Sequence, residues 1–127
     1  MHRILRLLLI FPLFFGCHSR LSDPDGTDHR VTNHEPFDRR GELVFTRHAR
    51  CRMDCRHITA REIHEVLDNG IINYSKSEPD SRPDPKYAVE GYTTEQQHLR
   101  IIVAPENAKL IIITCIELGV EWSCHCN

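Results

Sequence analysis

The chain has 127 residues, of which 40% are hydrophobic and 27% charged, and its formal net charge is −2. This length corresponds to one domain, and the near-neutral charge excludes a whole-chain polycation of the kind that coats nucleic acid. The six cysteines are many for a cytosolic protein and few for a miniprotein held together by disulfides alone.

Residues 1–16 have the pattern of a lipoprotein export signal. Arg3 and Arg6 precede an apolar run of about ten residues, which is too short to cross a membrane as a helix. The sequence that ends in Gly16-Cys17 resembles a bacterial lipobox. This resemblance implies that Cys17 carries lipid and holds the protein on a membrane of the cell envelope. Cleavage leaves 14 basic and 18 acidic residues, a net charge of −4 that argues against nucleic acid as a partner.

Residues 17–41 are predicted to form a flexible tether between the lipid anchor and a folded domain. They are rich in Asp, Pro, Gly, Thr and Asn, and they lack a periodic apolar pattern. The folded domain is therefore expected to span residues 42–127.

The domain begins with two predicted helices. Thr46 can cap a helix over residues 47–56. The next helix starts at a capping box formed by Thr59 and Glu62, and it ends at Gly70, where glycine can adopt the left-handed conformation.

Strand-like runs follow the helices, at residues 71–74, 86–92, 98–103 and 109–116. The last two flank a predicted hairpin loop at 104–108, and a short apolar segment at 43–45 precedes the first helix. Cys115 lies in the last strand and is expected to be a buried apolar residue. Helices followed by strands predict an α+β domain with an antiparallel sheet of three to four strands.

The first helix and the start of the second resemble a bacterial family, the domain of unknown function 4258. The matching residues are His48-Ala49, Arg52-Met53, Arg56 and Ile58-Thr59. The likeness covers roughly residues 44–116 and implies no established activity. Two helices before an antiparallel sheet, with His and Arg on the first helix, also resemble the small ribonuclease toxins of toxin–antitoxin systems at the level of the fold.

Two pairs of cysteines give the most specific chemical signal. Cys51 and Cys55 lie four residues apart on the first helix, and Cys124 and Cys126 lie in the C-terminal tail. The geometry within each pair disfavours a direct bond, so the tail is expected to fold back onto the helix. The four cysteines then either hold a structural zinc ion or form two cross-bridges. Histidines that could replace a cysteine as a zinc ligand are His48, His57 and His125.

A histidine and several arginines are candidate catalytic residues. His48, Arg52 and Arg56 recur at four-residue steps and form one stripe of the first helix. His98 and Arg100 share the polar face of a predicted strand. Such side chains could cleave RNA, with His48 as acid or base and the arginines as phosphate ligands.

Three functions therefore remain open. The first is a lipid-anchored binding or accessory domain that is stapled by its cysteine cluster and recognises an unknown protein or small molecule. The second is a ribonuclease-like enzyme, which the acidic charge and the envelope location disfavour. The third is a metal-handling or redox protein, against which the lack of a Cys-x-x-Cys motif argues.

Overall fold

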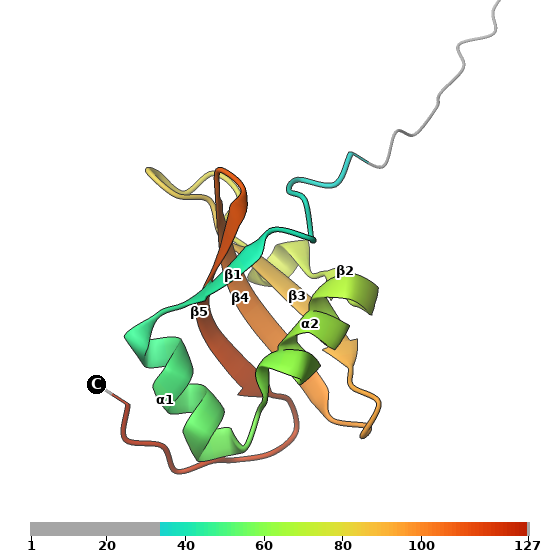
Figure 1. The fold of residues 1–127 in the computed structure, drawn as a ribbon, viewed down its shortest axis with the longest axis vertical. Coiled ribbons are helices and arrows are strands. Elements are labelled where there is room, and N and C mark those ends of the chain that lie inside the picture. Colours follow the sequence, from blue (N-terminus) through green and yellow to red (C-terminus); the bar gives the residue numbers. More distant parts are fainter. Residues whose placement is uncertain (1–33, 127) are drawn as a thin grey trace, which may run out of the picture. The chain divides into compact units, whose positions relative to one another are not determined.

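The computed structural model describes residues 34–126, so the predicted export signal and residues 17–33 of the predicted tether lie outside the described residues. The elements follow in the order β1 (Glu42–Phe45), α1 (Arg47–Arg56), α2 (Ala60–Asn69), β2 (Ile71–Ile72), the short 3-10 helix η1 (Tyr74–Lys76), β3 (Tyr87–Tyr92), β4 (His98–Glu106) and β5 (Lys109–Glu117) (Figure 1). None of the helices in this part of the chain is long and apolar enough to cross a membrane.

The sheet has five strands in the order β1-β5-β4-β3-β2. β1 pairs with β5 in parallel, and the other neighbours are antiparallel. The α+β class is confirmed, but the prediction of an antiparallel sheet with three to four strands is wrong. The extra strand is the apolar segment at 43–45, which pairs with a segment more than 60 residues later in the chain. Local sequence patterns do not reveal a partner at that distance.

The β4–β5 hairpin is longer than predicted. β4 runs on to Glu106, and only Asn107 and Ala108 form the turn, where Asn107 has a φ of 53°. Asparagine tolerates this left-handed conformation better than most residues. The register shifts between Ile102 and Val103, which indicates a β-bulge.

The caps predicted for both helices are present. The Thr46 side chain accepts a hydrogen bond from the amide of Ala49 at 3.0 Å. In α2, the Glu62 carboxylate accepts from the Thr59 amide at 2.7 Å, and the Thr59 hydroxyl accepts from the Glu62 amide at 3.3 Å. These bonds satisfy amides that a helix start leaves free.

Gly70 ends α2 for a reason other than the one predicted. Its φ is −76°, so the left-handed conformation is not used. A Cβ atom at this position would lie 2.4 Å from the carbonyl oxygen of Val66 and 2.6 Å from that of Glu90. Glycine is required here because α2 and β3 approach too closely for a side chain.

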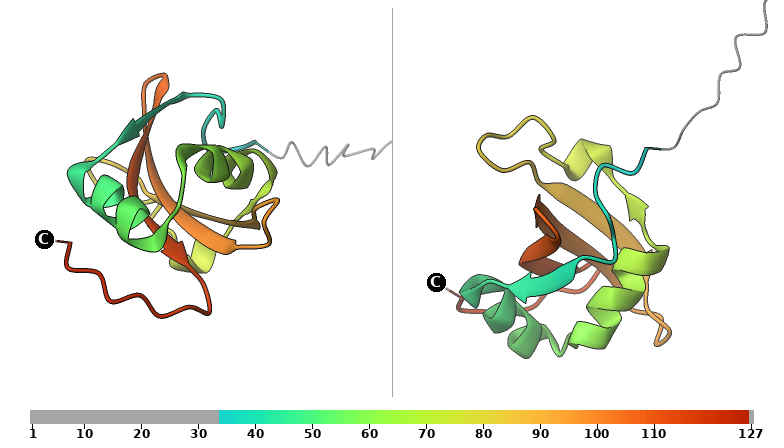
Figure 2. Two further views of the ribbon diagram at one scale, coloured as in Figure 1. Left: turned by 60° about the horizontal axis from the view of Figure 1, so that its bottom comes forward. Right: turned by 45° about the horizontal axis from the view of Figure 1, so that its top comes forward.

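Both helices, α1 and α2, cover one face of the sheet, and the hydrophobic core lies between the helices and this face (Figures 1 and 2). The largest fully buried side chains are Ile63, Leu67, Leu99, Ile101, Leu110, Ile112, Val66, Val89, Val103 and Cys115. The burial predicted for Cys115 is thus confirmed. Neither α1 nor α2 covers the opposite face of the sheet, which we call the uncovered face.

Two residues assigned to the tether by the sequence pack against the domain. Phe37 is buried, and its ring centroid lies 5.3 Å from that of Tyr87. Arg39 donates to the carbonyl oxygens of Leu67 at 2.8 Å and Gly70 at 2.7 Å. Arg39 thereby satisfies carbonyls at the end of α2 that lack a partner within the helix.

Candidate functional site

The C-terminal tail is joined to α1 by two disulfides. Cys51 pairs with Cys126 and Cys55 with Cys124, with Cα–Cα distances of 5.8 and 5.9 Å. The tail leaves β5 and runs beside α1 (Figure 2). The predicted docking of the tail is therefore confirmed, and the structure selects one of the pairings that the sequence left open.

Other contacts of the tail are few. The Trp122 indole donates to the Glu117 carboxylate at 2.8 Å, and its ring meets the His57 ring edge-on at a centroid distance of 5.7 Å. Among residues 34–126, no group of three or more His, Cys, Asp or Glu side chains is placed to hold a metal ion. The disulfides are thus the main attachment of the tail to the domain.

The stripe of His48, Arg52 and Arg56 lies on α1, as predicted, and its members have partners within the fold. Arg52 donates through Nε to His48 Nε2 at 3.3 Å. Arg56 donates to the backbone carbonyl of Cys115 in β5. Burial and the neighbouring Arg52 lower the pKa of Arg56. These contacts favour a structural role for both arginines.

Cys115 lies beneath this stripe and is a free thiol with no exposed surface. Burial raises its pKa to about 11, although Arg56 and Arg52 oppose this shift. A thiol with such a pKa stays protonated at neutral pH and is a poor nucleophile. Cys115 is therefore an unreactive residue of the hydrophobic core, as predicted.

His98 and Arg100 lie on the uncovered face of the sheet, where they contact β3. Arg100 forms an ion pair with Glu90 at 2.5 Å, and His98 stacks on Tyr92 with ring centroids 4.3 Å apart and planes 11° apart. Both pairs are direct cross-strand neighbours in the β3–β4 register. The structure thus groups these two candidates with each other and with β3, and their contacts do not include the α1 stripe.

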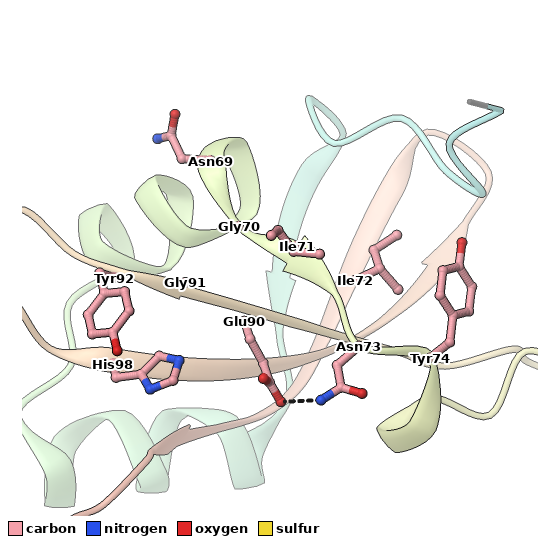
Figure 3. Close-up of a pocket in the computed structure, with 10 residues that line it drawn as sticks. All are labelled: Asn69, Gly70, Ile71, Ile72, Asn73, Tyr74, Glu90, Gly91, Tyr92 and His98. Atoms are coloured by element: carbon pink, nitrogen blue, oxygen red, sulfur yellow. Dashed lines mark hydrogen bonds between the residues drawn. The ribbon is translucent and has the colours of Figure 1, made fainter. Parts of the chain in front are cut away.

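Glu90 occupies a polar cluster on this face. Burial raises its pKa, but hydrogen bonds from Arg100 and Asn73 outweigh burial, and the net pKa is lowered. Asn73 donates to Glu90 Oε1 at 3.0 Å (Figure 3). Glu90 is therefore an ionised carboxylate at neutral pH, held by two neighbours.

We expect Glu90→Gln to flatten the acid side of the stability profile. Because the pKa of Glu90 is lower in the folded state, the ionised side chain stabilises the fold above its unfolded pKa, and this stabilisation disappears as the pH falls through the folded pKa. On acidification the wild type should therefore lose about 1 kcal/mol of unfolding free energy, as expected for a half-buried ion pair. Urea unfolding of the wild type and the variant at pH 7 and pH 3 measures this loss.

The exposed Glu78, which pairs with Lys86, serves as the control. Glu78→Gln should leave the unfolding free energy unchanged at both pH values. Parallel pH profiles for Glu90→Gln and the wild type would contradict the assignment.

A pocket of about 590 Å³ lies between the end of α2, β2 and the neighbouring ends of β3 and β4. Its lining residues are Asn69, Gly70, Ile71, Ile72, Asn73, Tyr74, Glu90, Gly91, Tyr92 and His98 (Figure 3). Of these, only His98 was a candidate site residue from the sequence. The alternation in residues 86–92 does place Glu90 and Tyr92 on one face, but Asn73 and Tyr74 carry no comparable signal.

No curated protein and no solved structure matches the chain, so the fold-level likeness to ribonuclease toxins gains no support. One family model, described as a domain of unknown function (DUF4258), matches residues 45–117. The match covers more than half of the chain and includes both helices and β2 to β5. The chain therefore belongs to the DUF4258 family.

Proposed function

We propose that this protein is a lipid-anchored binding or accessory module of the bacterial cell envelope. The observation that carries the proposal is the pair of disulfides between α1 and the C-terminal tail. Disulfides persist in oxidising compartments and are rare in the reducing cytosol. An exported domain that is anchored through Cys17 would meet such a compartment.

The pocket beside β2 supports a binding role. Its volume of about 590 Å³ lies within the range of about 300–1,000 Å³ that small-molecule sites occupy. Aromatic, aliphatic and polar side chains line it together. This mixture is typical of a site that orients a ligand by a few hydrogen bonds and holds it by apolar contact.

The two alternative functions would use side chains that already have partners. RNA cleavage would need Arg52, Arg56 or Arg100 to face a phosphate, whereas these arginines bond to His48, to the carbonyl of Cys115 and to Glu90, respectively. Metal binding by the cysteine cluster would require the two disulfides to be absent, and a redox role would normally use a Cys-x-x-Cys spacing, which these cysteines lack. The contacts of the described residues therefore favour binding over either alternative.

We expect Cys17→Ser to move the protein from the membrane fraction to the soluble fraction. Without the cysteine thiol there is no site for the lipid, and the acyl chains supply the membrane affinity. Cell fractionation followed by immunoblotting of the full chain measures the distribution. Ser22→Ala, in the same tether, is the matched control and should leave the protein with the membranes. Equal membrane fractions for wild type and Cys17→Ser would overturn the anchoring proposal.

A further inference from the structure

We propose that the pocket beside β2 binds a neutral or amino-sugar glycan, with sugar rings packed against Tyr92 and Tyr74 and hydroxyl groups bonded to Glu90. This inference rests on the proposed binding function and specifies its ligand. It is carried by three features of the pocket, which are its exposed aromatic rings, its fixed polar centre and its charge.

Exposed apolar side chains gather at this pocket. Four large hydrophobic residues are strongly exposed in the described part of the chain, namely Ile71 at 77%, Tyr92 at 63%, Tyr74 at 59% and Val120 at 48%. The first three line the pocket, and Val120 lies elsewhere in the tail. Exposed apolar residues that cluster in this way mark binding surfaces, whereas single ones do not. Tyrosine also offers a hydroxyl group, which suits a ligand with both apolar and polar faces.

The two tyrosines lie at opposite ends of the pocket, with a polar centre between them (Figure 3). Tyr92 is held against the His98 ring at 4.3 Å. Tyr74 begins η1, a turn fixed by the Asn73 side chain, which accepts from the Ser75 amide at 3.1 Å. A ring that is already ordered, as that of Tyr92 is, loses little entropy when a ligand stacks on it. An elongated ligand with repeated ring faces fits this spacing of aromatic, polar and aromatic groups.

The polar centre has unused hydrogen-bonding capacity. Arg100 and Asn73 both donate to Oε1 of Glu90, and within residues 34–126 Oε2 of the same carboxylate accepts no hydrogen bond. A carboxylate oxygen accepts strongly from hydroxyl or ammonium groups. A sugar that lies between the two tyrosines can donate such a hydroxyl group.

The charge of the pocket does not attract acidic ligands. Its lining contains the carboxylate of Glu90 and no Lys or Arg side chain. Arg100 is paired with Glu90 and is not part of the lining. A uronic acid, a phosphate or an acidic peptide would thus place a negative charge beside an ionised carboxylate. Neutral and amino sugars avoid this repulsion.

An extended peptide fits less well than a glycan. A peptide that joins a sheet edge gains its affinity from main-chain hydrogen bonds along several residues. β2 is the edge strand here, but it contains only Ile71 and Ile72. The pairing surface is therefore too short for a bound strand, while the aromatic rings remain available.

Titration calorimetry of the full chain with both disulfides formed tests the proposal. The probes are a trimer of N-acetylglucosamine, which is neutral, a trimer of glucosamine, which is cationic, a trimer of galacturonic acid, which is anionic, and a lysine-containing hexapeptide. We expect one or both of the first two to bind and the anionic trimer not to bind. Tyr92→Ala and Tyr74→Ala should each weaken binding about tenfold, as expected for the loss of one aromatic stacking partner. Val120→Ala is the matched control and should bind like the wild type.

The proposal is overturned if neither sugar trimer binds, if the anionic trimer or the peptide binds more tightly, or if the tyrosine variants bind like the wild type. Thermal unfolding of each variant confirms that these exposed substitutions leave the fold intact. The result is independent of anchoring. If the protein fractionates with membranes through Cys17 but binds no glycan, the anchoring proposal stands and the glycan site is wrong. If it binds glycans but is not anchored, the glycan site stands and the anchoring proposal is wrong.

Discussion

Removal of both disulfides should lower the free energy of unfolding by about 6 kcal/mol, more than the sum of the two single removals. The bridges join residues that are 75 and 69 positions apart. On the chain-entropy relation, a loop of this size stabilises the fold by about 4 kcal/mol. Because a domain of this size has a total stability of about 5–15 kcal/mol, the variant without bridges should be marginal or unfolded.

The loss of stability on removing both bridges exceeds the sum of the two single losses because both bridges close the same large loop. Cys51 and Cys55 are on one helix, and Cys126 and Cys124 are on one short tail segment. Once one bridge has closed the long loop, the other closes only a ring of a few residues. Loss of a single bridge should therefore cost about 2 kcal/mol, because the large loop stays closed. Contacting sites are where such non-additivity is expected.

Urea unfolding of the full chain, monitored by circular dichroism, measures these differences. The variants are Cys51→Ser with Cys126→Ser, Cys55→Ser with Cys124→Ser, and all four together. Wild-type protein treated with dithiothreitol should behave like the fourfold variant. A zinc site predicts the reverse pattern, with loss of stability on chelation by EDTA and little change with a small amount of reductant. That pattern, or a fourfold variant within about 1 kcal/mol of the wild type, would contradict the bridges.

Ile101→Ala should destabilise the protein by about 2–5 kcal/mol, whereas Ile102→Ala should cost about 1 kcal/mol or less. Ile101 is completely buried in the central strand β4, opposite Val89 on β3 and Cys115 on β5. Its truncation leaves a cavity that rigid neighbours cannot fill. The adjacent Ile102 points to the uncovered face of the sheet and is only half-buried, so water can replace its lost atoms.

The two isoleucines form a matched pair, because chemistry, strand and β-propensity are the same and only the face of the sheet differs. Denaturant unfolding of both variants at equal pH gives the comparison. Equal losses for the two substitutions would mean that a partner or another segment covers the second face in solution. A larger loss at Ile102 would show that the helices pack on the opposite side from that described.

Local features of the fold were predictable from the sequence, and long-range ones were not. The capping box of Thr59 and Glu62 spans four residues, so its chemistry is fully contained in a short segment. The parallel pairing of β1 with β5 joins distant segments, and nothing in Leu43-Val44-Phe45 identifies its partner. The end of α2 at Gly70 was predicted, but its cause is a contact with β3 that only the tertiary structure reveals.

The candidate site shows the same division. The spacing of the four cysteines predicted that the tail meets α1, since the geometry within each pair disfavours a direct bond. The choice between Cys51–Cys126 and the alternative pairing depends on the direction in which the tail runs along the helix. The pocket escaped prediction because α2, β2, η1, β3 and β4 each contribute only a few residues to it.

The position of α1 has a consequence for association between molecules. β1 pairs only with residues 109–112 of β5, so the rest of that strand would present a free edge to other chains. α1 continues directly from β1, and the carbonyls of Ile113 and Cys115 are occupied by Thr46 and Arg56. Unpaired strand edges are templates for aggregation. By fastening the tail to α1, the disulfides hold the helix that occupies this edge, so the bridges that stabilise the fold also keep the sheet from pairing with other chains.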